Sequence, residues 1–132
     1  SSDNSLLKTA LDYYEKGIAI DKKCYGDLHP NLAVGYGNIA NVYGSMGQFE
    51  KALKYIDKSL EMLKRIYGAK SQNTAMALYN KGGVYYNMKK YSEALKYKEE
   101  GLKMFMEIVP ANHPSVKAMK QDVENTKRLI KQ

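Results

Sequence analysis

The chain has 132 residues, 44% of them hydrophobic and 27% charged, which is ordinary for a globular protein and excludes a disordered or collagen-like chain. No stretch approaches the ~20 uninterrupted apolar residues that a membrane-spanning helix needs, and the length suggests one domain. The formal net charge is +7, and residues 68–132 hold 12 basic and 6 acidic side chains, so this half alone carries +6. A basic half favours an anionic partner.

Six helices are predicted along the chain, because apolar residues recur at three- and four-residue steps. The predicted helices cover residues 4–25, 30–46, 49–67, 72–88, 91–108 and 114–131. Pro30 and Pro114 suit a first helical position, and the Ser71 hydroxyl can cap the free amide groups of the helix that follows it. Gly26 and Gly68 suit the turns that end the preceding helices, since glycine readily takes the left-handed conformation.

The sequence repeats itself with a period of 42 residues. Without any gap, Ala10, Ala52 and Ala94 fall at one position of the repeat, and Asn38 and Asn80 fall at another. A fixed period of this kind indicates stacked copies of a two-helix unit, because the copies bury a shared core that one unit cannot bury alone. We therefore expect an all-α fold of stacked antiparallel helix pairs.

One domain, residues 1–132, is predicted to contain all six helices. In it, residues 4–25 form an N-terminal half-repeat helix, residues 30–67 and 72–108 form two repeats, and residues 114–131 form a C-terminal capping helix. The last helix fits a cap because polar side chains cover most of it. Its narrow apolar stripe consists of Val116, Met119, Val123 and Ile130.

Three pieces of the chain carry a resemblance to a known family. They are Asn38-Ile39-Ala40-Asn41-Val42-Tyr43, Met46-Gly47-Gln48-Phe49 and Ala52-Leu53. This pattern resembles the tetratricopeptide repeat, and the 42-residue period with Gly-Asp-Leu-His-Pro-Asn between helix pairs resembles the long form found in kinesin light chains. The resemblance covers residues 6–116 and implies a right-handed α-solenoid that works as a protein-interaction module.

The repeated tyrosines are expected in the helical core rather than in a base-stacking site. They are Tyr13, Tyr43, Tyr55, Tyr85 and Tyr97. Large rings at these positions fill the space that the small residues of neighbouring helices leave. We expect all five to pack between helices.

Three further side chains carry specific expectations. Cys24 falls at the repeat position of Ile66 and Ile108 and is predicted to be buried and inert. As the single cysteine it cannot form an internal disulfide, which indicates a reducing compartment, and we expect a cytoplasmic protein. Lys81 and Lys98 stand where the first repeat has apolar residues, so we expect their heads to reach water or an acidic partner.

No pattern of catalytic residues is visible, and an enzyme is not predicted. Adjacent Glu99 and Glu100 point in different directions on a helix, and no glycine-rich phosphate loop occurs. One cysteine and two histidines are too few for a zinc site made of these residues alone, so neither a metal nor a cofactor is predicted. His29 and His113 lie two periods apart, each before a proline, and are interpreted as helix starts.

By the resemblance, the first helix of each pair lines a concave groove that binds a peptide or a partner helix. The predicted groove residues are Val34, Asn38, Asn41, Ser45, Met76, Tyr79, Asn80, Gly83, Tyr86, Asn87, Gln121, Asn125 and Arg128. The amides of Asn38 and Asn80 either pair with a peptide backbone or satisfy neighbouring groups of the protein itself. Tyr79 and Tyr86 are large and rigid with a polar tip, so they are candidate anchors for a partner that is acidic or amphipathic.

Two other functions stay open at this stage. The chain is basic, and some solenoids of helical hairpins read RNA. Arginine is scarce and the lysines are spread around the helices, however, which disfavours nucleic acid. The other function is self-association into a structural scaffold through the helix of residues 10–25.

Overall fold

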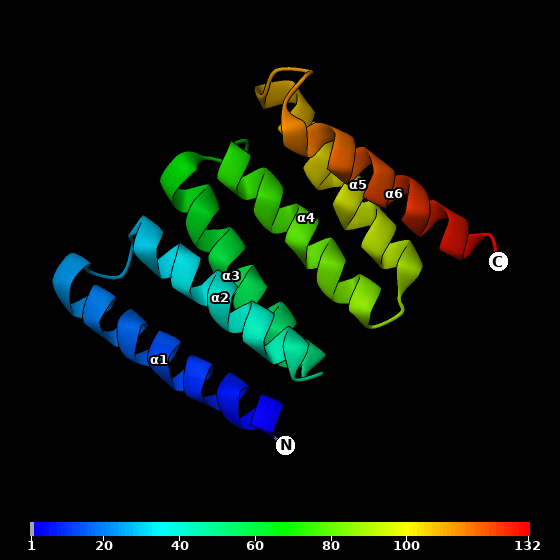
Figure 1. Ribbon diagram of the computed structural model, residues 1–132. Coiled ribbons are helices and arrows are strands. Elements are labelled where there is room, and N and C mark those ends of the chain that lie inside the picture. Colours follow the sequence, from blue (N-terminus) through cyan, green and yellow to red (C-terminus); the bar gives the residue numbers. More distant parts are fainter. Residues whose placement is uncertain (1) are drawn as a thin grey trace. The chain divides into compact units, whose positions relative to one another are not determined.

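The computed structural model describes residues 2–132, with side chains described for residues 4–132. It contains six α-helices and, within the described residues, no strand, which confirms the predicted all-α class. The helices are α1 (Ser2–Tyr25), α2 (Pro30–Ser45), α3 (Phe49–Tyr67), α4 (Gln72–Asn87), α5 (Tyr91–Ile108) and α6 (Pro114–Ile130) (Figure 1). Their bounds lie within two residues of the predicted ones.

The chain divides into two compact units, Ser1–Ile66 and Tyr67–Gln132. The first unit holds α1, α2 and nearly all of α3, and the second holds α4, α5 and α6. In the first unit α1 packs on α2, and in the second unit α5 packs on both α4 and α6. The single domain predicted for residues 1–132 stays a prediction.

Local side chains set the helix starts, as predicted. The imidazole Nδ1 of His29 accepts a hydrogen bond from the amide of Asn31 at 3.1 Å, and that of His113 accepts one from the amide of Ser115 at 3.1 Å. The Ser71 hydroxyl caps α4 in the same way. Each contact satisfies an amide that the first turn of a helix leaves without a partner.

Four of the five repeated tyrosines pack between helices. Tyr43 stacks on Tyr55 with ring centroids 5.6 Å apart, and Tyr85 stacks on Tyr97 at 5.4 Å. Tyr13 is 75% exposed, so the prediction that it is buried is wrong. The other pairs form because α2 presents a tyrosine to α3 and α4 presents one to α5, whereas the structure describes no ring stacked on Tyr13.

The predicted burial of Cys24 is wrong, because this residue is exposed. It lies in the last turn of α1, and of the two equivalent residues Ile108 of α5 is exposed and Ile66 of α3 is half-buried, so neighbouring helices cover this position only in part. Ile130 is exposed in the last turn of α6, and the fully buried Thr126 takes its place in the stripe that faces α5. The other three residues of the apolar stripe, Val116, Met119 and Val123, are buried.

In the second unit α4 and α5 approach each other so closely that glycine is required. A Cβ added to Gly101 would lie 2.7 Å from the carbonyl oxygen of Ala75 and 2.7 Å from the amide nitrogen of Tyr79. A Cβ added to Gly82 would lie 2.8 Å from the carbonyl oxygen of Ala94. All three obstructing atoms belong to the backbone, which cannot rotate away as a side chain can.

Replacing Gly101 by alanine should destabilise the protein by about 1–2 kcal/mol, because the new methyl group overpacks the contact with α4. Helix propensity favours alanine by about 1 kcal/mol and acts in the opposite direction, so a net loss reports the clash. Gly83→Ala is the matched control, since a Cβ there meets no described atom within 4 Å, and it should be neutral or stabilising. Urea unfolding measures both, and equal effects would contradict the close approach.

Candidate protein interface

The exposed face of α4 carries amide side chains around an open glycine. Asn80 and Asn87 lie seven residues apart and are both exposed. Within the described part of the chain, their amides form no hydrogen bond. Between them, Gly83 leaves the backbone open, and the half-buried Met76 lies one turn before Asn80. Such a strip offers donors and acceptors together with close access to the helix.

On α2 the predicted groove residues divide into two groups. Asn41 and Ser45 are exposed. Val34 and the half-buried Asn38 line a hollow of about 230 Å³ between α1 and α2. The first unit therefore brings Asn38 together with residues of α1, a contact that the sequence did not predict.

Tyr79 and Tyr86 take part in a partly buried polar cluster of the second unit, in which Lys98 and Thr126 are buried and Asp122 is half-buried. The Tyr79 hydroxyl donates a hydrogen bond to the carboxylate of Asp122 on α6. The Lys98 ammonium lies 2.9 Å from the same carboxylate, 3.1 Å from the Thr126 hydroxyl, and 4.2 Å from the centre of the Tyr86 ring. Both tyrosines thus contact the protein's own side chains, although each is still half-buried rather than fully covered.

Lys98 is only 3% exposed, so its charge needs every one of these partners. The expectation that its head finds an acidic partner is confirmed, although the head does not reach water. Lys81 is half-buried, and its ammonium lies 4.7 Å from the centre of the Tyr97 ring. In both cases an aromatic face accompanies the charge, a contact that favours a partly desolvated cation.

The cluster also changes the acidity of Tyr79. Burial raises the pKa of the Tyr79 hydroxyl well above its ordinary value, and the hydrogen bond to the negative Asp122 raises this pKa further. The hydroxyl therefore keeps its proton and stays a donor across the physiological range.

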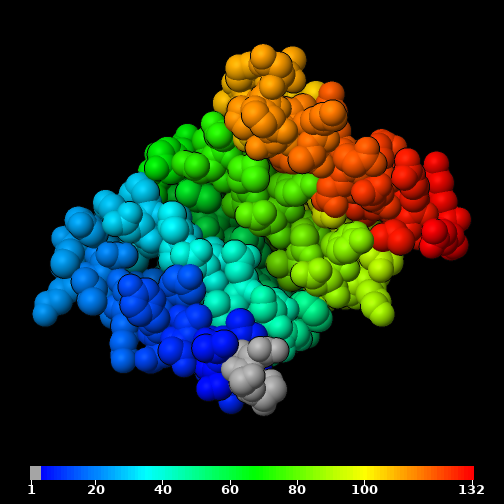
Figure 2. All heavy atoms as spheres, in the orientation of Figure 1, coloured from blue at the N-terminus to red at the C-terminus, as the bar shows by residue number. Residues whose placement is uncertain are grey.

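The predicted residues of α6 lie together on its exposed surface. Gln121 Nε2 donates a hydrogen bond to Asn125 Oδ1 at 3.1 Å, and Arg128 Nη1 donates one to the same oxygen at 3.5 Å. All three side chains are exposed. Figure 2 shows α6, orange to red, along the surface of the second unit.

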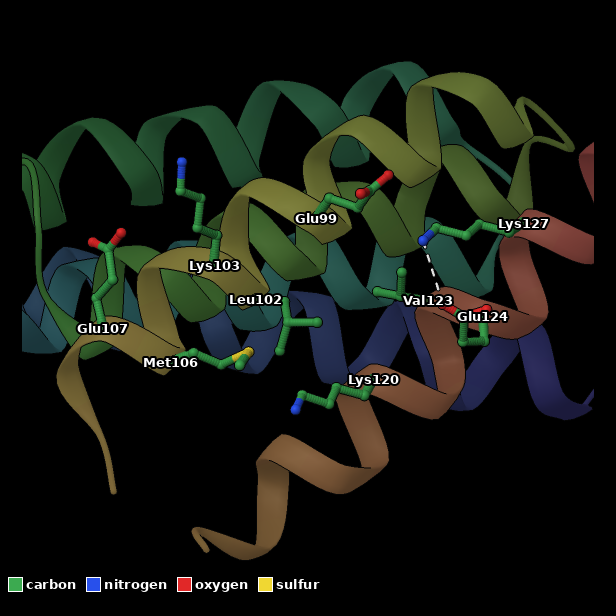
Figure 3. A pocket seen from close by; sticks show the side chains of 9 residues that line it. All are labelled: Glu99, Leu102, Lys103, Met106, Glu107, Lys120, Val123, Glu124 and Lys127. Carbon is green, nitrogen blue, oxygen red and sulfur yellow. Dashed lines mark hydrogen bonds and ion pairs between the residues drawn. The ribbon is translucent and has the colours of Figure 1, made fainter. Parts of the chain in front are cut away.

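A larger hollow, which the sequence analysis missed, lies between α5 and α6 (Figure 3). Its volume is about 630 Å³, and its lining consists of Glu99, Leu102, Lys103, Met106, Glu107, Lys120, Val123, Glu124 and Lys127. Leu102, Met106 and Val123 form its apolar part, and an ion pair of 3.3 Å joins Lys127 to Glu124 beside it. The sequence does contain one indication of this hollow, because the apolar residues Leu102 and Met106 lie four residues apart on an otherwise charged helix face.

Within the described residues, no group of three or more histidine, cysteine or acidic side chains is placed to hold a metal ion. No helix of the described chain is long and apolar enough to cross a membrane.

The family model described as tetratricopeptide repeat matches residues 4–64 and 32–107. The chain belongs to the tetratricopeptide repeat family. This fold is that of a protein–protein interaction module, and proteins of the family generally act as scaffolds or adaptors rather than as enzymes. No curated protein sequence is significantly similar to the chain.

Solved structures share the tetratricopeptide-like fold. BtubC (BKLC) from P. vanneervenii superposes with a TM-score of 0.85 over 96% of this chain, at 19% sequence identity. The nearly identical TPR-like repeats of a protein from Podosopora anserina that is named as a kinesin light chain give a TM-score of 0.81 over 98% of this chain, at 17% identity. The chain spans 50% of the first structure and 62% of the second.

Replacing Asp122 by alanine should destabilise the protein by about 3 kcal/mol, because it leaves the buried ammonium of Lys98 without its counter-charge. The double variant Lys98→Ile with Asp122→Asn carries the residues that the first repeat has at these positions, Ile56 and Asn38. It should recover most of the loss, since no buried charge remains. Chemical denaturation of both variants measures the difference in the free energy of unfolding, and equal destabilisation would contradict the pairing of buried Lys98 with Asp122.

Alkaline pH should unfold the protein partly through Tyr79. In the unfolded chain a tyrosine loses its proton near pH 10, whereas folded Tyr79, with its raised pKa, keeps the proton. The stabilising contribution is therefore complete below pH 10 and falls as the pH rises above it, by at most about 1.4 kcal/mol per pH unit. Tyr79→Phe should flatten this fall in urea unfolding curves taken at several alkaline pH values, and an unchanged slope would contradict the assignment.

Proposed function

We propose that this tetratricopeptide repeat chain is an adaptor that binds a peptide or a partner helix through exposed amide-bearing helix faces, that of α4 in the second unit and that of α2 in the first. The residues that meet the ligand are those predicted for the groove, with Asn41 and Ser45 on α2 and Asn80 and Asn87 on α4 as the exposed polar contacts. The kinesin-light-chain-like repeat type supports adaptor or cargo-recognition work.

The exposed amides of α4 carry this proposal. If Asn80 and Asn87 served only to satisfy neighbouring groups of the protein, their side chains would be hydrogen-bonded within it. They form no such bond in the described residues, and they flank the open backbone at Gly83. An amide that is free on both its donor and its acceptor side can pair with a peptide backbone whatever the peptide's sequence.

The charge distribution supports an acidic or amphipathic ligand. Residues 68–132 carry a net charge of +6, whereas residues 1–67 carry +1, from 9 basic and 8 acidic side chains. Complementary charge mainly speeds the encounter, so salt should slow association more than it weakens the final contacts. The single free cysteine, Cys24, fits work in the reducing cytoplasm.

Selection of a peptide library against the wild-type protein and against an Asn80→Ala/Asn87→Ala variant tests the proposal. We expect an enriched motif whose affinity falls at least about tenfold in the variant, because two hydrogen bonds are lost. Asn112→Ala, in the turn before α6, is the control, since it removes an exposed amide elsewhere and should bind as the wild type does.

A motif that the Asn80→Ala/Asn87→Ala variant binds unchanged would contradict the assignment of this face. Capture of any oligonucleotide with a steep loss of binding at higher salt would instead indicate a basic nucleic-acid-binding repeat. Tyr79 is a poor probe for this purpose, since its substitution also disturbs the cluster around Asp122.

A further inference from the structure

Four exposed lysines of the first unit surround three tyrosine rings. The rings are those of Tyr36 and Tyr43 on α2 and Tyr55 on α3, and the centroid of Tyr55 lies 6.1 Å from that of Tyr36 and 5.6 Å from that of Tyr43. Each lysine holds its ammonium group 5.0–6.0 Å from the centre of one or two of these rings. We call this set the lysine patch, and its members are Lys22 of α1 and Lys51, Lys54 and Lys58 of α3.

The lysine patch has little negative charge around it. Among the described residues none of its ammonium groups forms an ion pair. The carboxylates of α3, those of Glu50, Asp57 and Glu61, lie on another side of the helix than the rings over which the lysines lean. One carboxylate of α1 does come close, since burial raises the pKa of Tyr43 and a neighbouring tyrosine and Glu15 raise it further. Four cations thus share one nearby carboxylate on the side of the rings.

The repeat shows that the fold does not require this positive charge. A shift of 42 residues places Lys51 on Glu93 and Lys58 on Glu100, and both glutamates are exposed. The equivalent ring of α5, Tyr97, stacks in the second unit all the same. Lysine at positions 51 and 58 is therefore not needed for the packing of the rings, and its charge is available for a ligand.

The lysine patch lies away from the amide-bearing face of α2. Tyr36 and Tyr43 are seven residues apart, so they share one side of α2, and both are buried. Asn41 and Ser45 each lie two residues from Tyr43 and are exposed on the opposite side of the helix. A ligand of the lysine patch would thus use a different surface from the ligand of the proposed adaptor face.

We infer that the lysine patch is a docking surface for an acidic helix of a partner protein. Lys51, Lys54 and Lys58 follow one another at three- and four-residue steps, so their positions rise by about 4.5 Å and 6 Å along α3. Carboxylates at the same steps on a partner helix rise by the same amounts, and each can meet one ammonium group. A second copy is a poor occupant, because each copy carries a net charge of +7 and two copies repel each other.

The composition of the patch disfavours nucleic acid and membranes as ligands. Tyr36 and Tyr43 are only 8% and 9% exposed, so their rings cannot stack on bases. All four cations are lysines, whereas the planar fork of arginine suits phosphate groups best. No large apolar side chain is exposed among the described residues of the patch, so nothing there can insert into a membrane.

Two alanine-based peptides of identical composition test the inference. In the first peptide, glutamates three and four residues apart form one row, and in the second the same glutamates are spread around the helix. A hydrocarbon staple keeps both peptides helical. At about 50 mM salt, where screening is weaker than in the cell, the first peptide should cause saturable shifts of the NMR amide signals around Lys22 and Lys54 of the isotope-labelled full chain. It should bind at least about threefold more tightly than the second, because only a row brings every carboxylate to an ammonium group.

The variant Lys51→Glu/Lys58→Glu gives the decisive comparison. It carries the residues of the second unit at these positions, so the unfolding midpoint should change little. Binding of the first peptide should weaken at least about tenfold, because two attractions become repulsions. Lys51→Gln/Lys58→Gln removes only the charges and should weaken binding by a smaller factor.

The variant Lys117→Glu/Lys131→Glu is the matched control. It changes the net charge by the same amount in the more basic unit, and both lysines are exposed without an ion pair in the described chain. If long-range attraction alone held the peptide, this variant would lose as much affinity as Lys51→Glu/Lys58→Glu does. We expect it to keep nearly all of the wild-type affinity.

Equal binding of the two peptides, equal losses in the two charge-reversal variants, or shifts confined to the second unit would each overturn the inference. So would a single-stranded oligonucleotide of equal charge that binds the same residues as tightly. A protein mass that rises with concentration, and that Lys51→Glu/Lys58→Glu keeps monomeric, would make a second copy the occupant. The Asn80→Ala/Asn87→Ala variant should bind the acidic peptide normally, so failure of this surface and failure of the proposed peptide-binding face are distinguishable.

Discussion

In each unit, one helix passes closely over a small residue of the next, and this contact constrains how the side chains of both helices are arranged. In the second unit the contact is Gly101 against the backbone of α4, and in the first it is the Ser59 hydroxyl, which donates to the Ala33 carbonyl at 2.8 Å. Gly17 of α1, Ser59 of α3 and Gly101 of α5 occupy the same position of the repeat. Because the crossing point fixes the rotation of each helix, it also decides which tyrosines stack and which asparagines face outward.

The cluster around Lys98 positions α6 by a different means. An ion pair that involves a buried charge adds little stability over an apolar pair of the same size, but removing one partner strongly destabilises the protein. Any alignment of α6 that separates Asp122 from the Lys98 ammonium leaves a buried charge unpaired, so only one alignment is favourable. The same cluster engages Tyr79 and Tyr86, and this leaves the amides, rather than the rings, as the free groups on the exposed face of α4.

The repeat period is strong enough to predict the helices, their caps and the tyrosine pairs, because all of these depend on neighbours at fixed spacing. It does not predict burial where the neighbour itself is absent or different. Tyr13 and Tyr97 share one repeat position, yet Tyr97 meets Tyr85 and Tyr13 meets no equivalent ring. The role of Tyr79 likewise depends on Asp122, 43 residues away, which stands where the earlier copies have asparagine. An alignment shows equivalence of position but not the contacts that give a position its role.

Within the described residues, the face of α1 that carries Tyr13 and Ile20 is open, whereas helices of the same unit cover the equivalent faces of α3 and α5. Hydroxyl-radical footprinting of the free protein, read by mass spectrometry, tests this with residues of matched chemistry. We expect Tyr13 to react much faster than Tyr43, which is 9% exposed, and Ile20 to react much faster than Ile56, which is 3% exposed. If Tyr13 and Ile20 were as protected as their buried counterparts, the face would already be covered and the account would be contradicted.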